Sequence, residues 1–523
     1  MMQLDKVSLA DSNAFSPSFI DYIQERETLR PFYNRFPAIA SFEKQIAEKK
    51  SSFSSDIRTT LVNTLQRQYH DYTLDPAVEA NISHLAHDNT FTVTTGHQLN
   101  IFTGPLYFVF KIVTVINACK KLKAQYPDYN FVPVYWMASE DHDYDEIKYF
   151  RLYGKKYVWN TDQQGAVGRF NTSGLEALAR EIPGNADIFY NAYSQQKTLA
   201  QAARQYVNSL FGHEGLVVVD ADDRSLKAHF SSMIRKDVLD NANKPLVEKT
   251  NEALEANGYK TQVFCREINF FYLEDGLRSR IEKQGDRYHV VDTSLSFTSE
   301  EIENMIRDSP ERFSPNVILR PLYEEMILPN LAYVGGPAEV TYWLQLKDVF
   351  DSFNVPFPIL LPRNFGMIVD HEVARKFSKT GLELKSLFEE KNYMFNHWVL
   401  THSPRNLTVG DERTAVAEIF QTLMKKAKEI DTTLTAFVAA EEKRAINSLE
   451  KIERKYLRAE KRLHGDKLRQ IEAVKDALFP NGNLQERTDN FLNFYQRDPK
   501  FIQHLLDNFD PFDFKFNILT YMS

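Results

Sequence analysis

The sequence is poor in cysteine, and this excludes several classes of protein. Cys119 and Cys265 are the only cysteines among its 523 residues, too few for a disulfide framework or a cysteine-rich zinc site. Cys119 lies in an apolar segment and Cys265 in an aromatic one, and neither setting activates a thiol as a nucleophile. This cysteine usage indicates a reducing compartment, so we expect a cytoplasmic protein.

Long apolar runs and an excess of basic residues are also absent. No run approaches the ~18 apolar residues of a membrane span, and the first residues lack the apolar segment of a secretory signal. A net charge of −8 argues against nucleic-acid binding, which needs a basic surface. We therefore expect neither a membrane nor a nucleic-acid partner, while a small anionic substrate remains compatible with a single cationic pocket.

The common motifs of hydrolases and nucleotide-binding enzymes are missing as well. The chain contains no G-x-S-x-G, no Walker lysine motif and no G-x-G-x-x-G, which removes the usual serine-hydrolase, P-loop and dinucleotide-binding classes. What is present is a globular composition, 43% hydrophobic and 13% aromatic. Its length predicts a large main domain with insertions or a second body.

Five segments, one of them rich in β-branched residues and the others mostly apolar, predict the strands of one parallel sheet. They are residues 91–96, 131–138, 215–223, the start of 330–346, and 356–364. Strands that are apolar on both faces are typical of a sheet covered by helices. Residues 105–126 predict a helix with Pro105 at its first position, which completes a right-handed βαβ unit. The pattern predicts an α/β fold with a doubly wound parallel core.

Segments of different character flank and interrupt this core. Two aromatic segments with glycine turns, 149–174 and 266–292, predict small antiparallel insertions. From Asp411 to His464 there is neither glycine nor proline, which predicts one helix of ~80 Å with a coiled-coil seam and a partner helix at 382–400. We expect this pair to mediate dimerisation, and a charged helix on the surface of the body is the alternative. The predicted domains are a helical region at 1–90, the core at 91–370 with insertions near 149–210 and 262–312, the coiled coil at 371–480, and a tail at 481–523 that packs on the core.

A polar cluster follows each predicted strand. Because the carboxyl ends of parallel strands share one edge of a sheet, we expect these clusters to surround one crevice. The clusters are HQLNIFTGP after the first strand, SEDHDYDE after the second, DADD after the third, GGPAE after the fourth and PRN after the fifth.

Two of these clusters predict helix starts that bind an anion. Thr103-Gly104-Pro105 and Gly335-Gly336-Pro337 each lead into a helix, where free N–H groups favour phosphate or carboxylate. Ordinary capping, with Glu339 at the third helical position, is the structural alternative. Arg363 and Asn364 are further anion-binding candidates, and Lys111 lies either at the site or on the surface.

The acidic cluster SEDHDYDE supports two interpretations. Glu140, Asp141, His142 and Asp143 offer oxygen and imidazole ligands for a hard metal ion. Consecutive residues cannot all face one ion, however, and a second histidine at zinc spacing is missing. We therefore expect no tightly bound metal; one or two of these residues would accept hydrogen bonds from an amine or a ribose, and the others would cap the next helix.

The polar segments resemble a known family. TTGHQLNIFTGPLY, VPVYWMASEDHDYDEI, SPNVILRPLYEEMILPNLAYVGGPAEVTYW, LPRN and LFPNGNLQER are similar, in this order, to the signature segments of the BshC family, the cysteine ligases of bacillithiol biosynthesis. The resemblance covers nearly the whole chain. It implies a Rossmann-like core with two connective-peptide insertions, similar in plan to class I aminoacyl-tRNA synthetases, and a coiled coil that forms a homodimer. The implied reaction joins L-cysteine to the amine of glucosaminyl malate.

The resemblance suggests roles for the candidate residues, with ATP as the activating nucleotide. His97 and Gln98 would contact the activating phosphate or the developing oxyanion, and Glu140, Asp141 or Asp143 would hold the amine or act as its base. The segment Lys376–Thr380 resembles the lysine-rich synthetase loop but lies in a predicted helix. The candidate binding residues are Asn100, Thr103, Gly104, Lys111, His142, Gly335, Gly336, Glu339, Arg363 and Asn364.

Two other classes of function remain open from the sequence. One is a metal-dependent hydrolase of a sugar amide, and the other is a non-catalytic binding protein in which the long helices carry the function. The hydrolase would use His97, Glu140, Asp141 and His142.

Overall fold

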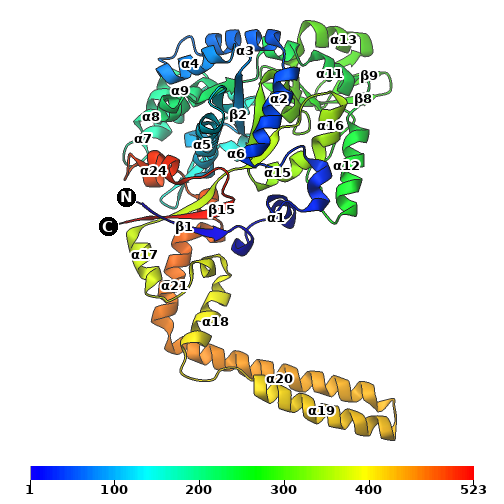
Figure 1. The fold of residues 1–523 in the computed structure, drawn as a ribbon, viewed down its shortest axis with the longest axis vertical. Helices are drawn as coiled ribbons and strands as arrows, with labels where there is room; N and C mark the ends of the chain where they lie inside the picture. The colour runs from blue at the N-terminus through cyan, green and yellow to red at the C-terminus, as the bar shows by residue number, and fades with distance from the viewer. Residues whose placement is uncertain (1, 523) are drawn as a thin grey trace. The chain divides into compact units, whose positions relative to one another are not determined.

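The protein forms two compact units in the computed structural model, which describes residues 2–522 (Figure 1). The first unit contains residues 2–10, 14–367 and 483–519, and the second contains 11–13, 368–482 and 520–522. None of the helices in this part of the chain combines the length and the apolar composition that crossing a membrane requires.

A parallel sheet of five strands forms the centre of the first unit. Its order is β13-β12-β2-β3-β6, and every neighbouring pair is parallel. The strand order reverses between β2 and β12, so the crevice of this doubly wound sheet lies between them. All five predicted strands and the Rossmann-like fold class are confirmed. The strands are β2 (Thr90–His97), β3 (Asn130–Met137), β6 (Val217–Asp220), β12 (Asn330–Gly335) and β13 (Ile359–Pro362).

Helix α5 (Tyr107–Gln125) connects β2 to β3 and packs on the sheet. Val115, Ala118 and Leu122 of α5 belong to one buried apolar cluster with side chains of α2 (Phe42–Ser52) and of four strands. The helix begins two residues later than predicted, so Pro105 precedes it instead of occupying its first position.

Two insertions interrupt the sheet. The first opens with the antiparallel pair β4 (Tyr149–Leu152) and β5 (Lys155–Val158), which lies within the antiparallel segment predicted at 149–174, and it continues with α-helices from Leu175 onward. The second is an antiparallel sheet in the order β10-β9-β8-β7-β11, as predicted. Its strands are β7 (Phe270–Glu274), β8 (Leu277–Gln284), β9 (Arg287–Val290), β10 (Ser296–Thr298) and β11 (Phe313–Pro315).

The remaining elements cover the core. The predicted N-terminal helical region contains α1 to α4 but opens with a strand, β1 (Met2–Ser8), which forms a further sheet with β15 (Lys515–Tyr521) and β14 (Phe365–Val369). The other helices of the first unit are α1 (Pro17–Ile23), α3 (Ser55–Gln68), α4 (Pro76–His84), α6 (Tyr144–Ile147), α7 (Leu175–Arg180), α8 (Asp187–Gln195), α9 (Leu199–Phe211), α10 (Arg224–Ala228), α11 (Ser231–Val238), α12 (Lys244–Ala256), α13 (Ser299–Asp308), α14 (Arg320–Ile327), α15 (Pro337–Trp343), α16 (Lys347–Ser352), α22 (Gln485–Thr488), α23 (Leu492–Tyr495) and α24 (Phe501–Asn508).

The second unit is helical, and its coiled coil differs from the prediction. The expected single helix over 411–464 is two helices, α19 (Gly410–Ile430) and α20 (Leu434–Leu463), which lie side by side (Figure 1). Asp431 ends the first helix and its Oδ1 accepts hydrogen bonds from N and Oγ1 of Thr433, both at 2.8 Å. A turn closed by an aspartate side chain therefore breaks the helix without glycine or proline. The unit also contains α17 (His371–Ser378), α18 (Lys391–His402) and α21 (Gly465–Leu478).

Candidate functional site

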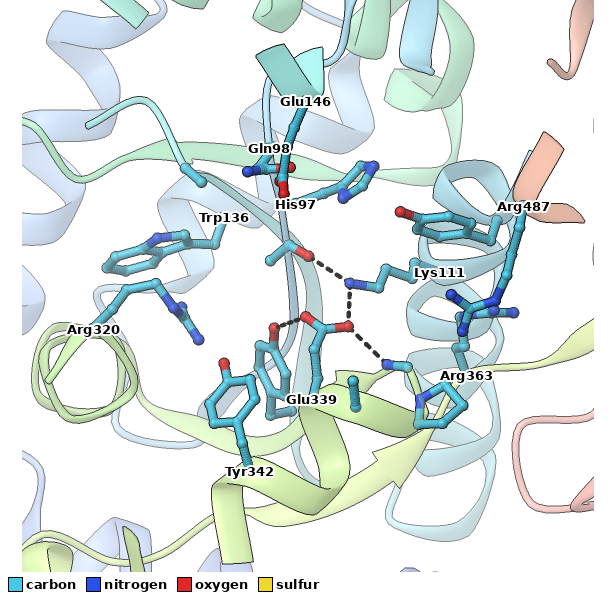
Figure 2. Close-up of a pocket in the computed structure, with 17 residues that line it drawn as sticks. His97, Gln98, Lys111, Trp136, Glu146, Arg320, Glu339, Tyr342, Arg363 and Arg487 are labelled. Atoms are coloured by element: carbon cyan, nitrogen blue, oxygen red, sulfur yellow. Dashed lines mark hydrogen bonds and ion pairs between the residues drawn. The ribbon is translucent and has the colours of Figure 1, made fainter. Parts of the chain in front are cut away.

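A cavity of about 570 Å³ lies at the crevice between β2 and β12 (Figure 2). Its walls come from the carboxyl ends of β2, β3, β12 and β13, together with residues of α5, α6, α14, α15 and α22. The histidine turn and the double-glycine turn, 238 residues apart in sequence at His97 and Gly335, thus lie on one rim. We call this space the larger cavity, to distinguish it from a smaller cavity that adjoins it and is described below.

Lys111 and Glu339 form an ion pair in the larger cavity. Lys111 Nζ lies 2.5 Å from Glu339 Oε2 and donates to the carbonyl of Gly96 at 2.8 Å. Tyr333 donates its hydroxyl to Glu339 Oε1 at 2.6 Å, as Figure 2 shows. Burial would raise the pKa of Glu339, but Lys111 and these hydrogen bonds lower it overall, while burial lowers the pKa of Lys111. The sequence left the place of Lys111 open, and the structure buries it at the site.

Three arginines add positive charge to the walls. Arg320 donates from Nη1 to Glu324 Oε2 at 2.6 Å, and its Nη2 is buried without a partner among the described residues. Arg363 makes a two-pronged ion pair with Glu486, at 2.5 and 3.1 Å, and lies over the Tyr107 ring. Arg487 lies at the exposed side of the cavity.

His97 is held as a neutral ring. Burial lowers its pKa to about 3, with the positive charges of Lys111 and Arg363 acting in the same direction and Glu339 opposing them. The ring contacts those of Tyr107 and Phe108, with centroids 5.4 and 5.1 Å away. Its buried Nε2 finds no hydrogen-bond partner among the described residues, so a bound molecule can supply one.

A smaller cavity of about 380 Å³ adjoins the larger one, and both are lined by Trp136, Ala138 and Arg320. The acidic cluster after β3 reaches this second space, because Glu140, Asp141 and His142 line it. Asp141 also accepts a hydrogen bond at 2.8 Å from Gln98 Nε2, which lines the larger cavity. The two cavities are therefore linked by one hydrogen bond as well as by shared walls.

The structure brings nine of the fifteen candidate residues to these cavities. His97, Gln98, Lys111, Gly336, Glu339 and Arg363 line the larger one, and Glu140, Asp141 and His142 line the smaller one. The six that line neither are Asn100, Thr103, Gly104, Asp143, Gly335 and Asn364.

The Thr103-Gly104-Pro105 turn differs from the expected anion site. Asn490 donates to the carbonyls of Phe102 and Gly104 at 2.7 and 2.6 Å, and Leu106 N donates to the carbonyl of Asp489 at 2.7 Å. The turn is thus occupied by the C-terminal tail. Gly104, at φ 62°, permits the contact with Asn100, which a Cβ would meet at 2.6 Å.

The double-glycine turn is capped by its own helix. Glu339 Oε2 accepts from Gly336 N at 2.8 Å, which is the capping arrangement considered as the alternative. The carbonyl of Gly335 accepts a hydrogen bond from Arg363 N at 2.9 Å. Asn364 is buried and donates to the carbonyl of Asp510 at 2.7 Å. The positive groups of the site are therefore side chains, not helix starts.

Several residues of the larger cavity were not among the site residues predicted from the sequence. Trp136 lies within β3, Arg320 begins α14, and Arg487 belongs to α22 of the tail. None follows a core strand, so the rule of strand ends could not select them. All three, however, lie within the segments VPVYWMASEDHDYDEI, SPNVILRPLYEEM and LFPNGNLQER that carry the family resemblance.

The four residues of the hydrolase alternative do not form a metal site. Glu140 pairs with Lys227 and Asp141 with Gln98, while His142 Nδ1 faces Arg278 Nη1 at 2.6 Å. Within residues 2–522, no group of three or more His, Cys, Asp or Glu side chains is placed to hold a metal ion. The observed geometry does not favour that alternative.

Known proteins resemble this chain over its whole length. Residues 2–364 match the family described as "Bacillithiol biosynthesis BshC, N-terminal Rossmann-like domain", and residues 366–521 match "Bacillithiol biosynthesis BshC, C-terminal coiled-coil domain". Proteins named "Putative cysteine ligase BshC" are 41% identical in Flavobacterium johnsoniae, over 99% of this chain and 100% of the relative, and 40% identical in Cytophaga hutchinsonii, over 99% of both. The chain belongs to the BshC family of bacillithiol biosynthesis.

Proposed function

We propose that the protein is the ligase that joins L-cysteine to glucosaminyl malate in the last step of bacillithiol biosynthesis. The observation that carries the proposal is the larger cavity, where Lys111, Arg320, Arg363 and Arg487 converge at the crevice of the sheet. Cationic side chains in a partly closed cavity attract carboxylate and phosphate groups. Malate supplies such carboxylates, and the relatives' name, cysteine ligase, supports cysteine as the other substrate.

The reaction forms an amide bond between the carboxyl carbon of cysteine and the amine of the sugar. A free carboxylate does not release its oxygen to an amine, so it must first be activated. ATP, when bound, would supply a phosphoryl or adenylyl group that takes up the leaving oxygen. The arginines and Lys111 fit such a nucleotide, because Arg320 Nη2 and Arg363 Nε are buried and unpaired in the described part of the chain.

Neutral His97 would stabilise the developing oxyanion as a hydrogen-bond donor. With a pKa of about 3, the imidazole is neutral at neutral pH and is therefore unsuited to act as a general acid. A neutral imidazole still donates from one nitrogen, and a preorganised donor in a buried site lowers the energy of a charged transition state. Gln98 would help to hold the loop, since it binds Asp141.

The acidic residues would receive the amino groups. Burial raises the pKa of Glu140 to about 6 despite its ion pair with Lys227, which places the carboxyl near the range suited to proton transfer. The structure adds Glu146 on the wall of the larger cavity. Asp143 is exposed and lines neither cavity, so Glu140, Asp141 and Glu146 are the preferred candidates.

We further propose that the chain acts in the cytoplasm as a homodimer through α19 and α20. The low cysteine content of the chain and a pathway that makes a low-molecular-weight thiol support the cytoplasmic location. Large apolar side chains left exposed along the helical pair support the second. They are Ile419, Leu423, Ile430, Leu434, Phe437, Ile452, Tyr456 and Leu463.

Incubation of the purified chain with glucosaminyl malate and cysteine, with and without ATP, tests the activity. Mass spectrometry should detect bacillithiol only when both substrates and ATP are present. His97→Ala should reduce the rate by about a hundredfold or more, as loss of an oxyanion donor does, and His87→Ala, at an exposed position, should not. Absence of the amide product from the wild-type chain under every condition would overturn the proposal.

A further inference from the structure

The lining of the smaller cavity combines two kinds of side chain. Met137, Phe271 and Val317 contribute apolar surface, and Glu140 and Asp141 contribute carboxylates. Such a combination suits a small ligand with a charged end and a weakly polar side chain. At about 380 Å³ the space is within the usual range for small-molecule sites.

The free hydrogen-bond acceptor in this cavity is a carboxylate oxygen. Arg278, which lines the cavity together with Arg320, already donates from Nε to Ser314 Oγ at 3.0 Å and lies 3.9 Å over the Phe271 ring and 3.8 Å from Asp141 Oδ1, besides its contact with His142. Glu140 contacts Lys227 through Oε1, and its Oε2 makes no hydrogen bond among the described residues. A ligand ammonium group therefore finds an acceptor at Glu140.

The boundary with the larger cavity is positive. Arg320 lines both cavities, and its unpaired Nη2 belongs to a guanidinium group lying over the rings of Trp136 and Tyr333. A carboxylate at this boundary would satisfy the buried donor. Its carbon atom would then face the larger cavity, where activation and attack are proposed.

We propose that the smaller cavity binds the amino-acid substrate, an α-amino acid with a small, weakly polar side chain such as a thiol. Glu140 receives its ammonium group, Phe271 and Val317 contact its side chain, and Arg320 holds its carboxylate at the boundary. This assignment rests on the ligase function proposed above and divides the two substrates between the two cavities.

Glucosaminyl malate, the acidic substrate whose amine is the acceptor of the cysteine, fits the larger cavity better. In the smaller one, its malate carboxylates would face Glu140 and Asp141, and like charges at close range repel. In the larger one they meet Lys111, Arg363 and Arg487. The charges of the two cavities therefore favour cysteine in the smaller one and glucosaminyl malate in the larger one. The wall they share at Trp136 and Arg320 would bring the cysteine carboxyl group close to the sugar amine.

Filling the smaller cavity tests the assignment. Val317 is 41% exposed, so Val317→Trp can be accommodated in the fold while its ring occupies the cavity. The variant should raise the KM for cysteine about tenfold or more and change the KM for the acceptor less than about twofold. Ala228→Trp, at an exposed helix position outside both cavities, is the matched control. Arg487→Ala should do the reverse and raise the KM for the acceptor.

A second variant tests the ammonium contact. Glu140→Gln should weaken cysteine binding about tenfold but leave the affinity for 3-mercaptopropionate, which lacks the amino group, unchanged. Calorimetric titration measures both without requiring turnover, so the result is independent of whether the chain ligates the substrates. Equal loss for both molecules, or a Val317→Trp variant with wild-type KM for cysteine, would overturn the inference even if the wild-type ligase is active.

Discussion

At the scale of single residues, the site depends on groups whose charge is set by burial. His97 is the clearest case, because its ring is surrounded by Tyr107, Phe108 and two cations. Desolvation and nearby positive charge act in the same direction on an imidazole, and both favour the neutral form. The residue therefore serves as a fixed dipole and not as a titrating acid.

This argument predicts the protonation state of His97. With a pKa of about 3, the ring should remain neutral when the protein is taken from pH 8 to pH 5. Nitrogen chemical shifts of ¹⁵N-labelled histidine rings, assigned by comparison with His97→Gln, report the state directly. A His97 signal that moves to the imidazolium position above pH 5 would contradict the assigned environment.

Glu140 should make stability depend on pH. Its folded pKa of about 6 exceeds the ordinary value of 4.5, so the folded state binds the proton more tightly than the unfolded chain. Its contribution to stability is therefore present below about pH 4.5 and is lost as the pH rises to 6. The expected loss is about 1–2 kcal/mol. Urea unfolding of wild-type and Glu140→Gln chains at pH 4.5 and 7 measures it: the variant should lack this component, and equal pH dependence in both proteins would contradict the prediction.

At the scale of elements, the strands were more predictable than the helices and the insertions. The strands β3 and β12 are largely apolar and β2 is rich in β-branched residues, because helices cover the sheet, and such runs are visible in sequence. The break between α19 and α20 was missed because it uses Asp431 and Thr433, residues that also occur within helices. A hydrogen bond to a local side chain cannot be read from apolar periodicity.

The site was predictable only where it follows a strand. The chain order of the strands placed His97, Glu339 and Arg363 on one edge of the sheet, and the structure places them around one cavity. Arg320 and Arg487 come from α14 and α22, whose packing against that edge depends on tertiary contacts. The Thr103 turn was selected for its glycine and proline, but the C-terminal tail occupies it.

Strand β12 is joined to β2 by a buried polar network that is testable. Asn330 Oδ1 accepts from Thr92 and Thr94 at 3.1 and 2.9 Å, and its amide donates to Glu325, which pairs with Lys49 at 2.8 Å. The pairing of the two strands shifts register at this point. The side chain thus satisfies polar groups at an irregularity near the start of β12.

Asn330→Leu should destabilise the protein by about 3 kcal/mol or more, because it leaves several buried polar groups unpaired. Chemical denaturation monitored by circular dichroism measures the change. Asn304→Leu, at an exposed position, is the matched control and should alter the free energy of unfolding by less than about 0.5 kcal/mol. A loss at Asn330 no larger than in this control would show that the network contributes little.

At the scale of the whole molecule, the two units divide the tasks. The first contains both cavities, and the second contains the helical pair with its exposed apolar side chains. Apolar residues on α20 such as Ile452, Tyr456 and Leu463 follow one another at intervals of four and seven, which places them along one stripe of the helix. A second copy of the same stripe can cover it in a two-fold symmetric contact.

The oligomeric state tests this interpretation. Light scattering should give twice the chain mass of 60.8 kDa for the wild-type protein and about one chain mass for Ile452→Glu with Tyr456→Glu. Burial of two carboxylates in an apolar contact opposes association, whereas in the free helix both positions face water, so helical content should not change. Asn447→Glu with Ser448→Glu, at exposed polar positions of the same helix, adds equal charge and should leave the dimer intact. A wild-type mass of one chain, or dissociation by the control pair, would place the dimer contact elsewhere or remove it.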